Sequence, residues 1–203
     1  MERRFAMRAA TLGSFLIRPL ADFRSIETAG PGIRDEMEGT VALNIRDARF
    51  VGGSEDAQRL ESSFRLKIAE GGRVTFLNST VSRRIGDIYL LCLTSDPARP
   101  STIYPGYDTT IEVLSVEGLA RALTKAHPDR LGEWRVGAVR YERRVFELGE
   151  PMPLDTDPFV KEPRPEFVRQ REVRICWAAR DECDSSLVTL ATDATGFVRV
   201  RET

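Results

Sequence analysis

The stretch Phe159–Ala178, FVKEPRPEFVRQREVRICWA, combines a polar, proline-containing half with a strongly apolar half. In the second half Val173, Ile175 and Trp177 occur at every other position, and side chains at this spacing share one face of a β-strand. The two prolines limit the first half to one helical turn at most. The pattern therefore predicts a buried strand in the second half, with its apolar face directed into the core.

Gln170 and Glu172 enter this strand two residues apart, so they share the face opposite to Val173. A carboxylate at the mouth of a buried strand is either a catalytic group that faces a cleft or one half of an ion pair with a neighbouring arginine. The residues alone leave both interpretations open. We expect Glu172 to matter for function more than for folding.

Length and charge place limits on the class of protein. With 203 residues the chain can bury a hydrophobic core without disulfides or a structural metal. Its 30 basic and 31 acidic residues give a net charge of −1, which argues against a broad nucleic-acid or membrane-surface footprint but leaves a local basic patch open. No repeat or internal boundary is visible, so we expect one domain over residues 1–203. Neither a transmembrane run nor a clear signal peptide is evident, which favours a cytoplasmic protein without membrane partners.

Cysteine and histidine usage argues against disulfides and zinc. Cys92, Cys176 and Cys183 lack the regular spacing of a disulfide framework, so we expect reduced thiols. His127 is the single histidine, and one histidine with scattered cysteines is a poor zinc site. We therefore expect no metal, and we expect His127 to be dispensable.

The rest of the chain is β-rich. The run IGDIYLLCL at 85–93 is apolar on both faces, which is typical of a central strand. Ser115 can cap a helix over 116–126. The other expected elements are a strand at 5–9, a hairpin of 40–45 and 48–51, a polar loop at 52–61, a hairpin of 64–69 and 73–77 through 70–72, strands at 107–114 and 134–146, and a C-terminal meander of 171–178, 187–192 and 197–200. Together they predict an α+β fold: a single domain with a mainly antiparallel β-sheet core and a few short helices.

Polar residues gather at the ends of three of these strands, while the chain lacks a P-loop, a G-x-G-x-x-G run and a nucleophile elbow. The three clusters are Arg3, Arg4 and Arg8; Thr94 and Ser95; and Gln170 and Glu172. An arginine on a first strand, a hydroxyl on a middle strand and a Gln-x-Glu on a late strand resemble the order of elements in ADP-ribosyltransferase folds.

This resemblance implies NAD as a substrate and a glutamate that stabilises an oxocarbenium-like transition state. On the resemblance, the cofactor-binding residues are Arg4, Arg8, Thr94 and Ser95, and the catalytic residues are Glu172 and Gln170. Tyr104 lies in the loop at 100–105, where its ring can stack on a cofactor base or simply pack against the protein.

A second set of residues is similar to uncharacterised bacterial domains of unknown function. The matching residues are Phe5, Arg8, Phe23, Arg24, Glu27, Asp35, Glu38, Gly39, Cys92, Ser95, Phe159, Lys161, Glu172 and Arg174. This resemblance implies a bacterial or phage-borne protein of the conflict or defence kind, such as a toxin or effector.

Three functions follow from these observations. The first is an NAD-using ADP-ribosyltransferase or glycohydrolase. The second is a non-catalytic binding or regulatory module that uses the same polar cleft for a nucleotide, a protein partner or an inhibitor. The third and weakest is a nuclease-like or nucleic-acid-binding effector that uses basic and acidic side chains at Arg169, Arg171, Arg174, Asp35, Glu36 and Glu38. Convergence of Arg4 or Arg8 with Ser95 and Glu172 on one cleft is what the first function requires.

Overall fold

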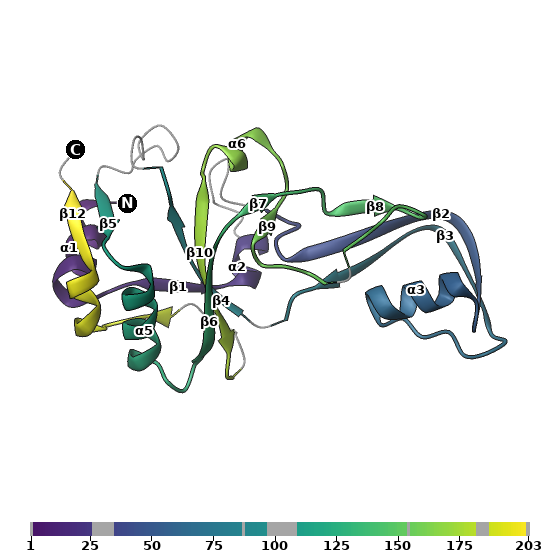
Figure 1. Cartoon of the computed structure of the whole chain (residues 1–203), viewed down its shortest axis with the longest axis horizontal. Coiled ribbons are helices and arrows are strands. Elements are labelled where there is room, and N and C mark those ends of the chain that lie inside the picture. The colour runs from purple at the N-terminus through teal and green to yellow at the C-terminus, as the bar shows by residue number, and fades with distance from the viewer. Residues whose placement is uncertain are drawn as a thin grey trace.

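The structure is a computed structural model that describes residues 2–25, 35–86, 88–96, 109–153, 155–181 and 187–201. The helices are α1 (Arg3–Leu12), α2 (Leu20–Ser25), α3 (Glu55–Phe64), α5 (Val116–Ala126), α6 (Pro165–Val168) and the 3-10 helix η1 (Thr192–Phe197). The strands are β1 (Leu16–Pro19), β2 (Thr40–Val51), β3 (Arg73–Arg84), β4 (Ile88–Thr94), β5 (Thr110–Val113), β6 (Leu131–Ala138), β7 (Arg140–Tyr141), β8 (Val145–Glu147), β9 (Val160–Lys161), β10 (Glu172–Ala179), β11 (Leu187–Val188) and β12 (Val198–Arg201). Figure 1 shows an elongated molecule in which a body that contains β10 continues into an arm of β2, β3 and α3.

The body is built around a five-stranded sheet in the order β11-β1-β4-β10-β6. The four strand pairings of this sheet in the described structure are antiparallel, and Trp177 of β10 lies opposite Tyr89 of β4 and Trp134 of β6. The predicted buried strand is confirmed as β10. The apolar run at 85–93 is also confirmed as a central strand, because β4 occupies the middle of the sheet.

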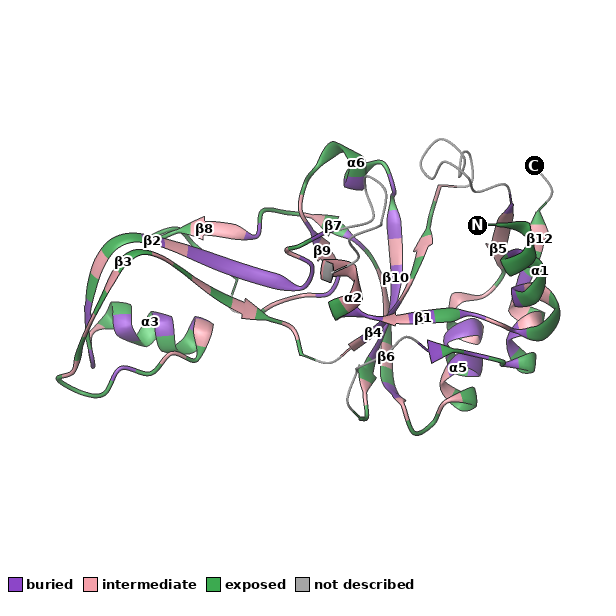
Figure 2. Cartoon of the chain, turned by 180° about the vertical axis from the view of Figure 1, so that it is seen from behind, coloured by how far each residue is buried: buried purple, intermediate pink, exposed green. Residues whose placement is uncertain are grey.

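The two faces of β10 differ in chemistry. Ile175 and Trp177 are buried against Leu119 and Leu123 of α5 in the largest apolar cluster. The Ser115 hydroxyl accepts a hydrogen bond from the Gly118 N–H at 3.0 Å, which caps α5 at its expected start. Figure 2 shows buried residues on α5 and along β10. On the other face a small apolar cluster of Leu20, Leu90, Phe159 and Cys176 gives way to buried charges.

The arm consists of β2 and β3, which pair in one antiparallel register along their whole length. We expected a hairpin that turned at residues 46–47, and this prediction was wrong. The chain does not reverse there, because β2 is continuous over Thr40–Val51. In the partner strand β3, Asn78 adopts a left-handed φ of 48°, and Leu77 and Asn78 are both exposed. The alternation of exposed and less exposed side chains therefore shifts by one residue in the middle of the paired strands. In the sequence, such a break in alternation resembles a turn between two short strands.

The expected loop at 52–61 and the hairpin through 70–72 were also wrong. Ser54 accepts a hydrogen bond from Ala57 N–H at 3.3 Å and begins α3, whose buried residues include Ala57 and Leu60. Most of the circumference of this helix is polar, so its sequence lacks the pronounced apolar periodicity that would predict a helix. Residues 65–72 then connect α3 to β3, and Gly71 takes a positive φ of 70° in this connection.

The expected strand at residues 5–9 is helical instead, as part of α1. Ala6 and Ala9 are buried three positions apart, which fits one face of a helix, whereas alternation of arginine and apolar residues had favoured a strand. Gly13 ends the helix with a φ of 62°, and its N–H donates to the Ala9 carbonyl at 3.1 Å. Burial of two small side chains therefore decides the local structure.

Two further topological predictions were wrong. The expected strand at 134–146 is divided into β6, β7 and β8, which pair with β10, β9 and β2 and so carry the chain from the body to the arm. The C-terminal segments do not form a meander with β10, because β11 pairs with β1 and β12 pairs with β5. The fold class is as predicted: α+β, with mainly antiparallel sheets and short helices.

Leu90 provides a direct test of the body. Its side chain is buried in β4, so Leu90→Ala should lower the free energy of unfolding by about 2–5 kcal/mol through lost burial and a residual cavity. Leu190→Ala is the matched control in the body, because Leu190 is 65% exposed and its substitution should change stability little. Equal urea midpoints for the two variants would contradict the assignment of β4 as a core strand.

Candidate functional site

Four of the residues predicted to form a site meet at one end of β4 and β10. Thr94 lies opposite Glu172 in the sheet, and its hydroxyl donates to the Gln170 carbonyl at 2.8 Å. The Ser95 hydroxyl donates to the Arg171 carbonyl at 3.1 Å. These hydroxyls therefore hold the end of β4 against the segment that leads from α6 into β10.

The other predicted cofactor-binding residues do not join this group in the described structure. Arg4 and Arg8 lie on α1, where Arg4 is exposed, pairs with Glu2 at 2.8 Å and stacks over Phe5. Figures 1 and 2 show α1 beside β12 at one end of the molecule, apart from α6 and the start of β10. Tyr104 lies outside the described residues.

Glu172 is buried, with 5% of its surface exposed, and both of its carboxylate oxygens have cationic partners. Arg174 Nε donates to Oε1 at 2.6 Å, and Lys161 Nζ donates to Oε2 at 3.1 Å. Lys161 also donates to the Gln170 side-chain oxygen at 3.2 Å. The carboxylate is therefore an ion-pair partner within the described contacts, one of the two roles that the sequence left open.

Arg174 connects Glu172 to a second buried carboxylate, Glu38. The guanidinium donates from Nη1 and Nη2 to the two oxygens of Glu38, at 2.8 and 3.0 Å. It also donates to the Pro158 carbonyl. Because Glu38 precedes β2 and Arg174 lies in β10, this bidentate pair joins the arm to the body.

Burial and pairing set the ionisation of this cluster. Burial alone would raise the pKa of Glu172, but the charges of Arg174 and Lys161 lower it to about 2. Asp35 differs, because burial and the negative charge of Glu38 raise its pKa. Glu172 is thus a stable anion at neutral pH, whereas folding favours the protonated form of Asp35.

Arg144, at the start of β8, extends this cluster towards the surface. Its side chain is 2% exposed, and Nη1 donates to the carbonyls of Met37 and Thr40 at 3.1 and 3.3 Å. Nε and Nη2, which form one edge of the guanidinium, have no hydrogen-bond acceptor in the described structure, and a carboxylate oxygen of Glu38 lies 3.8 Å from Nη2. Burial lowers the pKa of Arg144, although Glu38 opposes this effect.

Sequence reasoning found Glu172 but missed the partners that define its role. Arg174 carried a usable signal, because it lies on the same strand face as Glu172 and opposite to the apolar face. Lys161 and Glu38 carried none, since their proximity to Glu172 depends on the pairing of segments distant in the chain.

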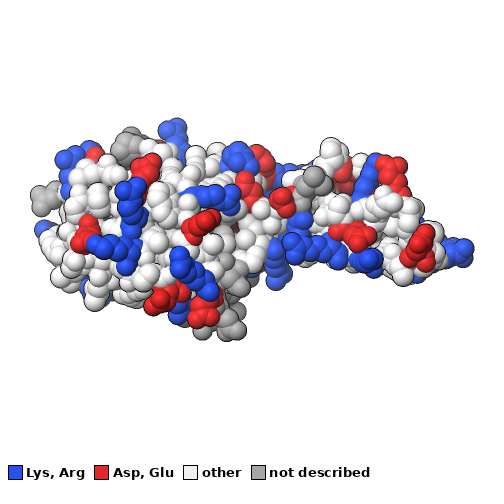
Figure 3. Space-filling model, turned by 60° about the horizontal axis from the view of Figure 1, so that its bottom comes forward, with Lys and Arg blue, Asp and Glu red and all other residues white. Residues whose placement is uncertain are grey.

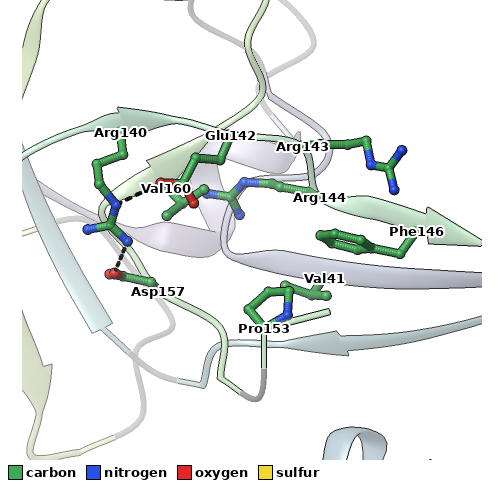
Figure 4. A pocket seen from close by; sticks show the side chains of 9 residues that line it. All are labelled: Val41, Arg140, Glu142, Arg143, Arg144, Phe146, Pro153, Asp157 and Val160. Atoms are coloured by element: carbon green, nitrogen blue, oxygen red, sulfur yellow. Dashed lines mark hydrogen bonds and ion pairs between the residues drawn. The ribbon is translucent and has the colours of Figure 1, made fainter. Parts of the chain in front are cut away.

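A surface pocket of about 350 Å³ lies next to this buried cluster, between the body and the arm. Its polar lining residues are Arg140, Glu142, Arg143, Arg144 and Asp157, and its apolar lining residues are Val41, Phe146, Pro153 and Val160. Figure 4 shows Arg140 reaching between Glu142 and Asp157, while Phe146, Val41 and Pro153 lie at the other end. The pocket therefore combines three guanidinium groups and two carboxylates with a group of apolar side chains at one end, so a bound molecule could contact both charged and apolar groups.

Comparisons with known proteins provide no relative: no family model, no curated protein and no solved structure matches the chain. Within the described ranges, no helix is long and apolar enough to cross a membrane. The same part of the chain contains no group of three or more His, Cys, Asp or Glu side chains that could hold a metal ion. The surface in Figure 3 carries acidic and basic side chains interspersed.

Glu172→Gln tests the buried cluster through the pH dependence of stability. Because the folded state lowers the pKa of Glu172 to about 2, its stabilising contribution is present above the unfolded pKa near 4.5 and is lost as the pH falls towards 2. The shift corresponds to about 3 kcal/mol at pH 7. We expect Glu172→Gln to lower the free energy of unfolding by about this amount at pH 7 and to approach the wild type near pH 2.

Glu112→Gln is the matched control for this measurement. Glu112 also accepts hydrogen bonds from two arginines, Arg199 and Arg201, but at the surface of the β5-β12 pair. The two arginines lower the pKa of Glu112 as well, but solvent screens this surface pair, so urea unfolding of this variant should depart from the wild type far less than Glu172→Gln does. A parallel, pH-independent offset for Glu172→Gln would contradict the assigned ionisation of the cluster.

Proposed function

We propose that the protein is a non-catalytic binding or regulatory module that holds a small anionic ligand, such as a nucleotide, in the pocket at Arg140. The observation that supports this function is the composition of the pocket, in which the guanidinium groups of Arg140, Arg143 and Arg144 lie beside apolar side chains and two carboxylates, Glu142 and Asp157. Its volume of about 350 Å³ lies within the range of sites for small organic ligands.

The rim arginines are available for exchange of partners. Arg140 Nε donates to Glu142 and Nη2 donates to Asp157, both at 2.9 Å, and Arg140 and Glu142 are each about half exposed. Surface ion pairs of this kind contribute about 0–1 kcal/mol each, so a phosphate or carboxylate can replace a side-chain carboxylate at low cost. Arg143 pairs with Glu150 and stacks on Phe146, which gives the rim a second exchangeable cation.

Arg144 supports the same ligand class from beneath the pocket. Its guanidinium is buried and retains an edge without a hydrogen-bond acceptor in the described structure. A buried positive charge at the wall of the pocket favours an anion within it, because the low local dielectric weakens screening. The apolar residues Phe146 and Val160 then provide a surface for a base or another ring.

The ion pairs of Glu172 with Arg174 and Lys161 favour a binding function over a catalytic one. A glutamate that stabilises a ribosyl cation needs a carboxylate directed at the substrate. Here the two oxygens of Glu172 accept hydrogen bonds from Arg174 and Lys161. Turnover would require at least one of these buried pairs to open.

A second candidate function is ADP-ribosyl transfer or NAD hydrolysis. One observation favours it: Thr94, Ser95, Gln170 and Glu172 meet at the same end of β4 and β10. The arginine that this function also requires there is not supplied by Arg4 or Arg8, which lie on α1 away from this end. NAD is its substrate, and the bacterial conflict or defence setting belongs with it as an expectation from the sequence.

Arg140→Ala tests the binding function. Isothermal titration calorimetry of the wild type with inorganic phosphate, AMP and NAD should detect binding of at least one of the three. Arg140→Ala should raise the dissociation constant for that ligand by about tenfold or more. Arg59→Ala is the control, because Arg59 forms a similar exposed pair with Glu55 on α3, outside the pocket. Equal binding by Arg140→Ala and the wild type would contradict the site.

An NAD turnover assay separates the two candidate functions. The binding module should consume no NAD above the buffer rate, whereas a transferase should consume it and should lose about 100-fold or more of its rate in Glu172→Gln. Both proteins are assayed at a temperature where circular dichroism reports the folded state. Glu172-dependent turnover by the wild type would replace the binding function with the enzymatic one.

A further inference from the structure

The outer edge of β3 is an unprotected strand edge. β3 is the outermost strand in the order β3-β2-β8, and Figure 1 shows it at the border of the arm. Residues 74–82 contain no charge and no proline. Within the described ranges β2 is the one strand with which they pair, and the Leu77 carbonyl also accepts a local hydrogen bond from the Ser79 hydroxyl at 2.9 Å. Edges of this length are normally protected by charges, prolines or a covering element, so an uncharged edge indicates a pairing surface.

The change of face within β3 restricts which strand can pair with it. Arg73, Thr75 and Leu77 are exposed before the irregularity, and Asn78 and Thr80 are exposed after it. The exposed face therefore uses odd positions up to Leu77 and even positions from Asn78. An added antiparallel strand keeps exposed side chains opposite exposed ones only if it changes face at the same point.

β3 of a second copy meets this requirement. When a two-fold axis passes between residues 77 and 78, Thr75 lies opposite Thr80 of the second copy, so two exposed β-branched residues form a pair. On the inner face Val74 lies opposite Val81 of the second copy. Cross-strand pairs of β-branched residues stabilise antiparallel sheets.

Charge favours the same register. A shift of the pairing by two residues would place Arg73 opposite Arg84 of the second copy at both ends, and directly opposed like charges are destabilising. With the axis between residues 77 and 78, Arg84 instead lies opposite Gly71, next to the exposed Glu70 of the second copy. The ends of the pairing are then complementary in charge.

We propose that two copies of this chain associate through β3, antiparallel about a two-fold axis between Leu77 and Asn78. The two arm sheets then form one six-stranded sheet through an isologous interface. The inference is independent of the anion pocket. A single strand pair gives an interface at the small end of specific contacts, so we expect the dimer to dissociate on dilution.

Sedimentation velocity of the full chain over a micromolar concentration series tests the association. The wild type should change from one chain to two as concentration rises, and Leu77→Arg should stay a single chain because it brings two arginines together near the axis. Leu190→Arg is the control: Leu190 is 65% exposed in the body, similar to Leu77, and its substitution should leave the dimer intact. Thermal melts confirm that each variant is folded. A wild type that stays a single chain, or one that forms open oligomers, overturns the proposal.

Disulfide cross-linking tests the register, in a background where the native cysteines are replaced by serine and the dimer is retained. A mixture of Thr75→Cys and Thr80→Cys should form a cross-linked heterodimer, and neither variant alone should cross-link efficiently. Leu77→Cys mixed with Thr80→Cys reports the shifted register, in which those two positions are opposed. Preferential cross-linking of that second mixture overturns the proposed axis.

Discussion

The Arg174 guanidinium, held between the carboxylates of Glu38 and Glu172, is the interaction on which the arrangement of the chain depends. Burying an arginine costs free energy that is recovered when carboxylates compensate its charge and N–H groups, and for Arg174 this compensation brings the segments that carry Glu38 and Glu172 together at β10. This requirement fixes the start of β2 against the body. Lys161 and Gln170 complete the compensation around Glu172, which brings β9 and the end of α6 to the same place.

The pocket and the buried cluster share one segment of chain, from Arg140 to Arg144. Within this segment β7 pairs with β9, and β8 then begins to pair with β2. The rim cations face solvent, whereas Arg144 at the end of the segment turns inwards towards Thr40 and Glu38. An anion bound at the rim therefore lies one short segment away from the ion pair that joins body and arm.

The sequence predicted what depends on local periodicity. The strand β10 and the helix α5 were correct because alternation in one and helical spacing with a serine cap in the other are unambiguous. The helices α1 and α3 were missed because their buried faces consist of a few small or isolated apolar residues. Glu172 was identified as special, but the arginine that pairs with it, Arg174, also binds Glu38, 136 positions away from Arg174 in the sequence, and no local pattern predicts such a contact.

The pairing of β1 with β11 has a consequence for the order in which the molecule folds. The Phe15 N–H donates to the Thr189 hydroxyl across 174 positions of sequence, and the Thr189 N–H donates back to the Phe15 carbonyl. The edge of the body sheet therefore cannot close until nearly the whole chain is available, and closing so large a loop is slow. By contrast, β2, α3 and β3 all derive from residues 40–84 and bury a cluster of their own. During synthesis the β2-α3-β3 unit can form on an emerging chain, whereas β1 can pair with β11 only after residues 187–188 have been synthesised.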